Sequence, residues 1–218
     1  MYDSRSNLII GFHGCDEAVK QKFINSSSSI QISQKPYDWF GHSIYFWENN
    51  YNRALEWAEN KKKRSEIETP AVVGAVLQLG YCCDLLDSRY LQVLKDYYVL
   101  MVADYKLVGQ ELPENKDIRN DIYKDKILRV LDCSVIEYMH SKIHEKYQKD
   151  INLNSFSDLK IFESTRCVFT EGGQAYAGAG IFEKSHIQIC IRNPDCIKGF
   201  FNPGKSTPFS KWVDGKVS

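Results

Sequence analysis

The strongest constraint on the fold of this chain is an aromatic segment, residues 37–48, in which six of twelve side chains are Tyr, Trp or Phe. The segment contains one glycine, Gly41, and no proline. So many rings must be buried or must line a pocket, because exposing apolar surface to water costs about 25 cal/mol per Å². Gly41 followed by β-favouring residues predicts a loop that leads into a strand. Asn50 can cap a helix directly after that strand.

The length of the chain, 218 residues, is enough for a single domain, residues 1–218, with a large core. The 28 basic and 28 acidic side chains cancel, so a contact with nucleic acid would have to be local. The apolar run after Asn7 and the run at 71–79 are both too short for a secretory signal or a membrane span. We therefore expect a cytoplasmic protein with no membrane contact.

The seven cysteines are odd in number and form no Cys-x-x-Cys pair. Their apolar neighbours, as around Cys190, predict free buried thiols rather than disulfides or a zinc site. Among the five histidines, only His140 and His144 have helical spacing, and the Glu that a zinc protease carries between them is missing. The sequence therefore predicts no metal.

Strands and helices are expected to mix without regular alternation, which indicates an α+β fold. Apolar alternation and short apolar runs predict strands at 8–13, directly after Gly41, and at 71–79, 165–170, 187–191 and 197–201. Helical spacing predicts helices at 17–24, after Asn50, and at 88–103 and 121–147. Residues 85–150 are interpreted as a mainly helical insertion between strands. A brief strand at 30–33 and a polar tail that Trp212 docks complete the expected elements.

A glycine-rich loop, residues 171–180, follows the expected strand at 165–170 and contains four glycines. Such a loop permits close approach of the backbone to a ligand, or simply flexibility. It lacks the G-x-G-x-x-G spacing and the strand–helix context of a dinucleotide-binding fold, so it does not predict a Rossmann domain.

Three motifs occur in a fixed order along the chain. They are His13-Gly14 at the end of an early strand, Gly41-x-x-x-Tyr45-Phe46, and Glu183 before a late strand. The order resembles the histidine–tyrosine–glutamate class of ADP-ribosyltransferases, the class of the diphtheria-type toxins and the poly(ADP-ribose) polymerases. The resemblance covers residues 1–60 and 165–201. It implies a split, mixed β-sheet in which the helical insertion has no counterpart.

In that class the substrate is NAD, and the bond between nicotinamide and ribose is cleaved through an oxocarbenium-like transition state. The resemblance implies that Glu183 is the carboxylate that stabilises the developing positive charge. It also implies that the His13 side chain donates to a ribose hydroxyl and that the Gly14 backbone pairs with the carboxamide.

Aromatic and basic residues complete the implied NAD site. The nicotinamide ring is expected to stack on Tyr45 and Trp57, with Phe46 beside them. Arg53 and Arg166 are candidates for contact with the pyrophosphate.

Each of these residues also has an ordinary structural explanation. A histidine before a turn, a strand tyrosine and a glutamate before a strand all occur without any catalytic role. Glu171, in the glycine-rich loop, competes with Glu183 as the catalytic carboxylate. We favour Glu183 because it precedes the final well-formed strand, as the resemblance requires, and the choice between the two stays open.

The function expected from the resemblance is transfer of ADP-ribose from NAD to a macromolecule, which could be protein, RNA or DNA. Bacterial toxins and anti-phage effectors of this class suggest such a role here, with an antitoxin protein as a further candidate partner. Two alternatives remain: an NAD glycohydrolase that uses water as the acceptor, and a non-catalytic module that binds a nucleotide or a partner. A nucleophilic Cys15 is disfavoured, because no oriented histidine and asparagine motif follows it.

Overall fold

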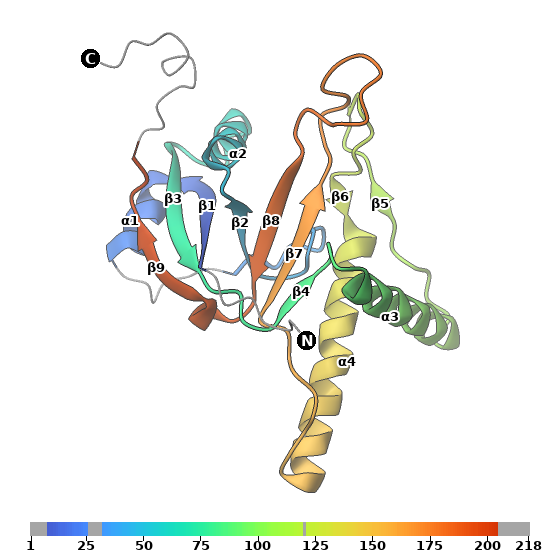
Figure 1. Cartoon of the computed structure of the whole chain (residues 1–218). Helices are drawn as coiled ribbons and strands as arrows, with labels where there is room; N and C mark the ends of the chain where they lie inside the picture. Colours follow the sequence, from blue (N-terminus) through green and yellow to red (C-terminus); the bar gives the residue numbers. More distant parts are fainter. Residues whose placement is uncertain (1–7, 26–31, 120, 205–218) are drawn as a thin grey trace, which may run out of the picture.

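The computed structural model describes residues 8–25, 32–119 and 121–204 as a mixed α+β fold built on one large sheet (Figure 1). The residues of the expected strand at 30–33 lie partly outside these ranges, and Trp212 lies wholly outside them. The elements are, in chain order, β1 (Ile9–Asp16), α1 (Glu17–Asn25), β2 (Ile44–Glu48), α2 (Tyr51–Lys63), β3 (Pro70–Leu77), β4 (Cys82–Asp84), α3 (Ser88–Leu107), β5 (Asn115–Lys116), β6 (Leu128–Arg129), α4 (Val130–Asn154), β7 (Ser164–Phe169), β8 (His186–Ile191) and β9 (Ile197–Phe201).

The large sheet has seven strands in the order β4-β7-β8-β2-β1-β3-β9. Neighbouring strands are antiparallel except β4 and β7, which are parallel. Strands far apart in the chain therefore meet at the centre, where β8, β2 and β1 lie side by side. These are the strands that carry or follow the three motifs found in the sequence.

Helices α1 and α2 cover opposite faces of the β1–β3 half of the sheet. Phe23 of α1 packs in a cluster with Val73, whereas Ala54 of α2 packs with Val72, the preceding residue of β3. Successive side chains of a strand point to opposite faces, so both faces of β3 are buried. This is why β3 is a nearly continuous apolar run rather than an alternating one.

Helix α4 covers the other half of the sheet on the same face as α2 (Figure 1). Tyr45 and Trp47 point to one face of β2; the first packs near Ile136 of α4 and the second against Ala54 of α2. Buried residues recur along α4 at steps of three and four, which forms the apolar stripe that a helix packed on a sheet requires. Helix α3 packs on α4 and is buried fully only at Met101.

The predicted helix at 121–147 is wrong over its first nine residues, because α4 begins at Val130. The carboxylate of Asp121 accepts hydrogen bonds from the backbone N–H groups of Tyr123 and Asp125, at 3.1 and 3.0 Å. Lys124 and Lys126 adopt left-handed backbone conformations. Such local side-chain bonds compete with helix formation, and apolar periodicity does not detect them.

The start of α4 is fixed by a residue from the preceding loop. The side-chain carbonyl of Asn115 accepts hydrogen bonds from the N–H groups of Leu131 and Asp132, at 2.9 and 3.2 Å. Asn115 also belongs to β5, which pairs with β6 immediately before the helix. A short strand, β5, therefore provides the cap of α4.

The other expected elements agree with the structure within a few residues. The short strands β4 and β6 were not predicted. The helices expected at 17–24, after Asn50 and at 88–103 are confirmed as α1, α2 and α3. The strands expected after Gly41 and at 8–13, 71–79, 165–170, 187–191 and 197–201 are confirmed as β2, β1, β3, β7, β8 and β9. Six of the seven cysteines are buried. Within the described ranges, every helix is too short or too polar to cross a bilayer.

Gly14 fits a very close contact between β1 and α2. A Cβ atom at this position would lie 2.0 Å from the backbone carbonyl oxygen of Ala54. We expect Gly14→Ala to lower the free energy of unfolding by roughly 1–3 kcal/mol, because a backbone atom cannot yield as a side chain can. Chemical denaturation of both proteins measures the difference.

Gly199→Ala, on β9, is the matched control, since its Cβ atom would meet nothing within 4 Å. Equal stability of the two variants would contradict the role assigned to Gly14.

Candidate functional site

The side chains of His13 and Tyr45 lie on opposite sides of the sheet. The β1–β2 ladder ends at Phe12 and Trp47, and beyond it His13 Nδ1 lies 2.8 Å from the carbonyl oxygen of Tyr45. The His13 ring contacts Phe23 of α1, whereas the Tyr45 ring packs on the α4 side. The two residues therefore meet through the backbone and do not form the two walls of one pocket.

The hydroxyl of Tyr45 is fully engaged in local structure. It donates to the carbonyl oxygen of Gly41 at 2.6 Å and accepts from the N–H of Phe40 at 2.8 Å. These bonds fix the loop that enters β2. Burial raises the pKa of Tyr45 well above its ordinary value, so the phenol stays protonated.

Phe46 and Gly14, both expected at the NAD site, belong to the core. Phe46 has no exposed surface and packs among the apolar residues on the α1 face. Gly14 is paired with Val72 and lies tightly against α2, so its small size serves helix packing. The close backbone approach predicted for a ligand is made instead by the α2 backbone.

Glu183 and Arg166 also lie apart from the other predicted residues. Glu183 is exposed, in the hairpin before β8. The guanidinium of Arg166 is held by Glu48, with an Nε–Oε2 distance of 2.6 Å, and by Asp84, at 3.3 Å. These contacts lie on the α1 face, so Arg166 is a structural ion-pair centre rather than a pyrophosphate ligand. The structure does not gather residues 13, 45 and 183 around a common cavity.

Arg53 and Trp57, on α2, do reach a cluster of functional groups, and Glu171 is at its centre. Arg53 Nη2 lies 3.5 Å from Glu171 Oε2. The Trp57 ring contacts that of Trp47, and Trp47 in turn contacts the ring of His186. We define the Glu171 cluster as Trp47, Arg53, Glu56, Trp57, Arg129, Glu171, Lys184 and His186.

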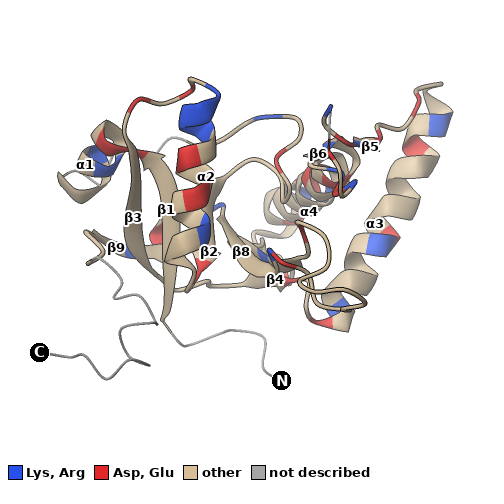
Figure 2. Ribbon diagram, turned by 90° about the horizontal axis from the view of Figure 1, so that it is seen from above, with Lys and Arg blue, Asp and Glu red and all other residues tan. Residues whose placement is uncertain are grey.

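The charged side chains of the Glu171 cluster form a chain of ion pairs. Arg53 donates to Glu56 at 2.5 Å, and Lys184 donates to the other oxygen of Glu56 at 2.6 Å. These bonds link α2 to the hairpin that precedes β8. Figure 2 shows acidic and basic residues interleaved along α2, on which two members of this network lie.

The position of Glu171 is set by a turn that only glycine adopts easily. Gly172 and Gly173, which follow it, both have positive φ. The N–H of Gly172 donates to the carboxylate of Asp125 at 2.9 Å, and Tyr123 lies where a Cβ of Gly173 would be. The segment before β6 therefore holds the turn in place, and the hairpin lies beside β5 and β6 in Figure 1.

Burial shifts the protonation of both Glu171 and His186. It raises the pKa of the Glu171 carboxyl, against the nearby positive charge of Arg53. It lowers the pKa of His186 to about 4, so the ring is neutral at neutral pH. His186 Nδ1 lies 2.6 Å from the carbonyl oxygen of Lys184, which assigns the proton to Nδ1. Nε2 is then an acceptor, 3.6 Å from Glu171 Oε1.

Several polar atoms of the Glu171 cluster are buried without a hydrogen-bond partner in the described part of the chain. They are four of six such side-chain atoms: Trp47 Nε1, Arg53 Nε, Arg129 Nε and His186 Nε2. A buried polar atom without a partner costs roughly 1–3 kcal/mol, and more for a charged group. Their concentration at one place is typical of a site that receives its partners from a polar ligand or from bound water.

Arg129 was not among the predicted residues. Its guanidinium lies 4.3 Å from the ring centre of Trp39 and 4.8 Å from that of Phe169. Arg129 reaches these rings because residues 121–129 are not part of helix α4. The one signal in the sequence was the aromatic segment itself, which provides Trp39 as a platform for a cation.

A separate cavity of about 980 Å³ lies at the opposite end of β8, next to α4 and Arg192. None of the residues predicted for the NAD site lines it. Within the described ranges, no group of three or more His, Cys, Asp or Glu side chains is arranged to hold a metal ion.

Comparison with known proteins finds a distant relative. The chain is 24% identical over 196 residues to the uncharacterized protein MJ0359 of Methanocaldococcus jannaschii, covering 86% of this chain and 83% of that protein. No family model and no solved structure matches the chain. The site must therefore be judged on its own chemistry.

Two buried histidines should make the fold sensitive to acid. Burial lowers the pKa of His186 to about 4 and that of His140 to about 3, below the ordinary 6.5. Below pH 6.5 the unfolded chain binds protons that the folded chain does not, so stability falls as the pH drops. Each histidine contributes a loss of up to about 1.4 kcal/mol per pH unit.

Denaturant unfolding at a series of pH values measures this loss. His186→Gln and His140→Gln should each lose less stability than the wild type between about pH 6.5 and pH 4. An unchanged pH slope in both variants would show that these rings are not buried and neutral.

Proposed function

We propose that this chain is an ADP-ribosyltransferase that uses NAD as substrate and Glu171 as the catalytic carboxylate. The sequence motifs resemble that class, and the strands β1, β2 and β8 that carry or follow them are adjacent. The resemblance favoured Glu183, with Glu171 of the glycine-rich loop as its competitor, whereas the surroundings of the two side chains favour Glu171. The proposal includes a macromolecular acceptor and a role as a toxin or anti-phage effector.

The observation that carries the proposal is the position of Glu171 between Arg53 and His186. Its side chain is 11% exposed, that of Arg53 is 14% exposed and that of His186 is fully buried. A carboxylate that is largely removed from water interacts strongly with a charge that develops beside it. Glu183 is exposed and solvated, so it would stabilise such a charge less.

The chemistry follows from this arrangement. The bond between ribose C1′ and the nicotinamide nitrogen breaks, and its electron pair leaves with nicotinamide. Ionised Glu171 stabilises the positive charge on the sugar more than it stabilises the ground state. A nucleophile of the acceptor then bonds to C1′, and its proton passes to Glu171. A carboxyl whose pKa is raised toward the working pH is a better proton acceptor than an ordinary one.

The other members of the Glu171 cluster have roles that fit this substrate. Trp57, which is partly exposed, provides an electron-rich face for the cationic nicotinamide ring, and the buried Trp47 ring supports it, with ring centres 6.0 Å apart. Arg53 and Arg129, each with a buried unpaired Nε, provide donors for phosphate or ribose oxygens. His186 Nε2 faces Glu171 and limits the orientations of its carboxyl.

Replacement of Glu171 separates the two candidate carboxylates. We expect Glu171→Gln to lower the rate of nicotinamide release from NAD by about 10²–10³-fold, as for other groups that stabilise a transition-state charge. The assay uses NAD labelled in its adenylate part, with cell extract as the source of protein, RNA and DNA. Glu183→Gln is the matched control and should keep near wild-type activity.

The outcomes of this assay discriminate between the functions. Label attached to a macromolecule supports transfer, whereas free ADP-ribose released without any acceptor indicates the glycohydrolase. If the wild type neither releases nicotinamide nor transfers label, the proposed function is wrong. If only Glu183→Gln loses activity, the assignment of Glu171 is wrong and the activity remains.

The pH profile tests the protonation state of Glu171. Activity requires the ionised carboxylate, so it falls as the pH drops through the raised pKa of this group. Arg53 opposes that rise, and Arg53→Gln should therefore move the acid limb of kcat/KM to higher pH. Arg53→Lys keeps the charge and should leave the limb near its wild-type position. An acid limb that does not move in Arg53→Gln contradicts the assignment.

A further inference from the structure

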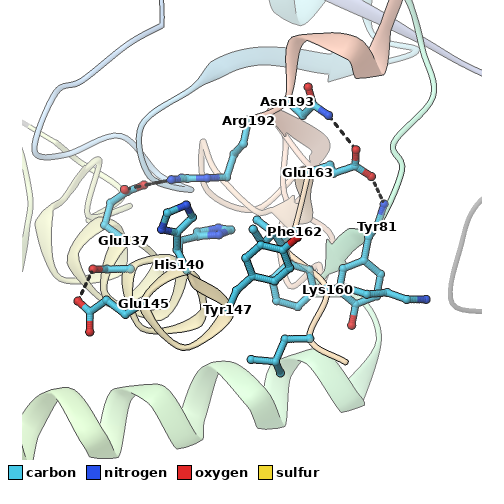
Figure 3. Close-up of a pocket in the computed structure, with 14 residues that line it drawn as sticks. Tyr81, Glu137, His140, Glu145, Tyr147, Lys160, Phe162, Glu163, Arg192 and Asn193 are labelled. Carbon is cyan, nitrogen blue, oxygen red and sulfur yellow. Dashed lines mark hydrogen bonds and ion pairs between the residues drawn. The ribbon is translucent and has the colours of Figure 1, made fainter. Parts of the chain in front are cut away.

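The cavity beside α4 has the size and position of a second ligand site. Its volume of about 980 Å³ lies in the range of small-molecule sites. The cavity is bounded by α4, by the segment before β7 and by residues 192–193 after β8 (Figure 3). The six residues of β8 place it about 17 Å from the Glu171 cluster.

Three charged side chains at one wall of the cavity, those of Glu137, Glu163 and Arg192, are already paired with partners in the protein. Arg192 donates to both carboxylate oxygens of Glu137, at 2.5 and 3.2 Å. Glu163 accepts from Asn193 and from the N–H of Tyr81, both at 2.8 Å, and Figure 3 shows these bonds at the wall. A charged ligand at this wall would have to break these contacts, so this wall favours an uncharged ligand.

One wall of the cavity is aromatic. The rings of Tyr81 and Phe162 are parallel, with centres 4.8 Å apart and planes inclined by 2°. Tyr147, on α4, is partly exposed and lines the same cavity. Tyr81 and Phe162 stack on each other, and Lys160 Nζ lies 5.5 Å from the Tyr81 ring centre, so the partly exposed Tyr147 ring is the one left to contact a flat heterocycle.

His140 provides an unused hydrogen-bonding group. The residue is 7% exposed and lines the cavity, and its Nε2 has no partner among the residues described. Burial lowers its pKa to about 3, so the ring is neutral at neutral pH. A neutral imidazole nitrogen away from water needs a hydrogen bond, and nothing else described at this wall supplies one.

We infer that this cavity binds an uncharged nucleoside, with its base against the aromatic wall and hydrogen-bonded to His140. A nucleobase is flat and uncharged and carries both donors and acceptors, which matches the three features of the wall. The ribose would lie toward Ser141 and Glu145, on the exposed side of α4. The inference does not depend on the proposed function, because the cavity shares no residue with the Glu171 cluster.

Binding of the four ribonucleosides to the full chain tests the inference. Each is titrated to about 1 mM, where a Kd corresponds to ~4 kcal/mol of binding free energy. We expect saturable binding of at least one nucleoside by calorimetry, with a shift of the His140 ring protons in NMR spectra. His140→Phe keeps the ring size and should weaken binding about tenfold, the effect of one lost hydrogen bond.

Two further variants keep the result interpretable. Ser141→Trp places a large ring at an exposed position of the wall and should abolish binding without disturbing the core. Glu171→Gln should bind the nucleoside as the wild type does, because it alters only the other site. Absence of binding by all four nucleosides, or equal binding by the wild type and Ser141→Trp, overturns the inference and leaves the proposed function untouched.

Discussion

The close contact between α2 and β1 is the constraint on which the rest of the structure depends. At Gly14 the helix backbone approaches so closely that there is no room for a side chain. The contact buries Trp47, Ala54 and Val72 in one cluster and sets the height of α2 above the sheet. Because Arg53, Glu56 and Trp57 lie on the same helix, that height also decides how near they come to Glu171 and His186.

The Glu171 cluster shows that this part of the molecule is not arranged for stability alone. Buried carboxyl, guanidinium and imidazole groups lie within a few ångströms of one another, and several of their polar atoms have no described partner. Hydrophobic residues of the same size would lower the free energy of the fold more than such a set does. Groups of this kind persist where a function needs them, which is why we place the chemistry here.

The local structure could be predicted from the sequence much better than the site could. Asn50, the aromatic segment and the apolar runs each predicted an element that is present, because caps and periodicity act over a few residues. The sequence motifs suggested that His13, Tyr45 and Glu183 share one site, but the structure does not bring these side chains together. Side-chain direction in a strand changes with each residue, and the β1–β2 register pairs Phe12 with Trp47. That register puts His13 level with Phe46 on one face and leaves Tyr45 on the other.

The sequence by itself determined the α+β class, most of the strands and helices, and three members of the Glu171 cluster, Arg53, Trp57 and Glu171. Only the tertiary structure decided which of these residues meet. Arg53, on α2, is more than a hundred residues of chain away from Glu171 and His186. Arg129 joins them because the hydrogen bonds to the Asp121 carboxylate keep the residues before Val130 out of helix α4. Contacts of this kind depend on strand order, register and helix height, which are set by packing across the whole sheet and leave no local signal.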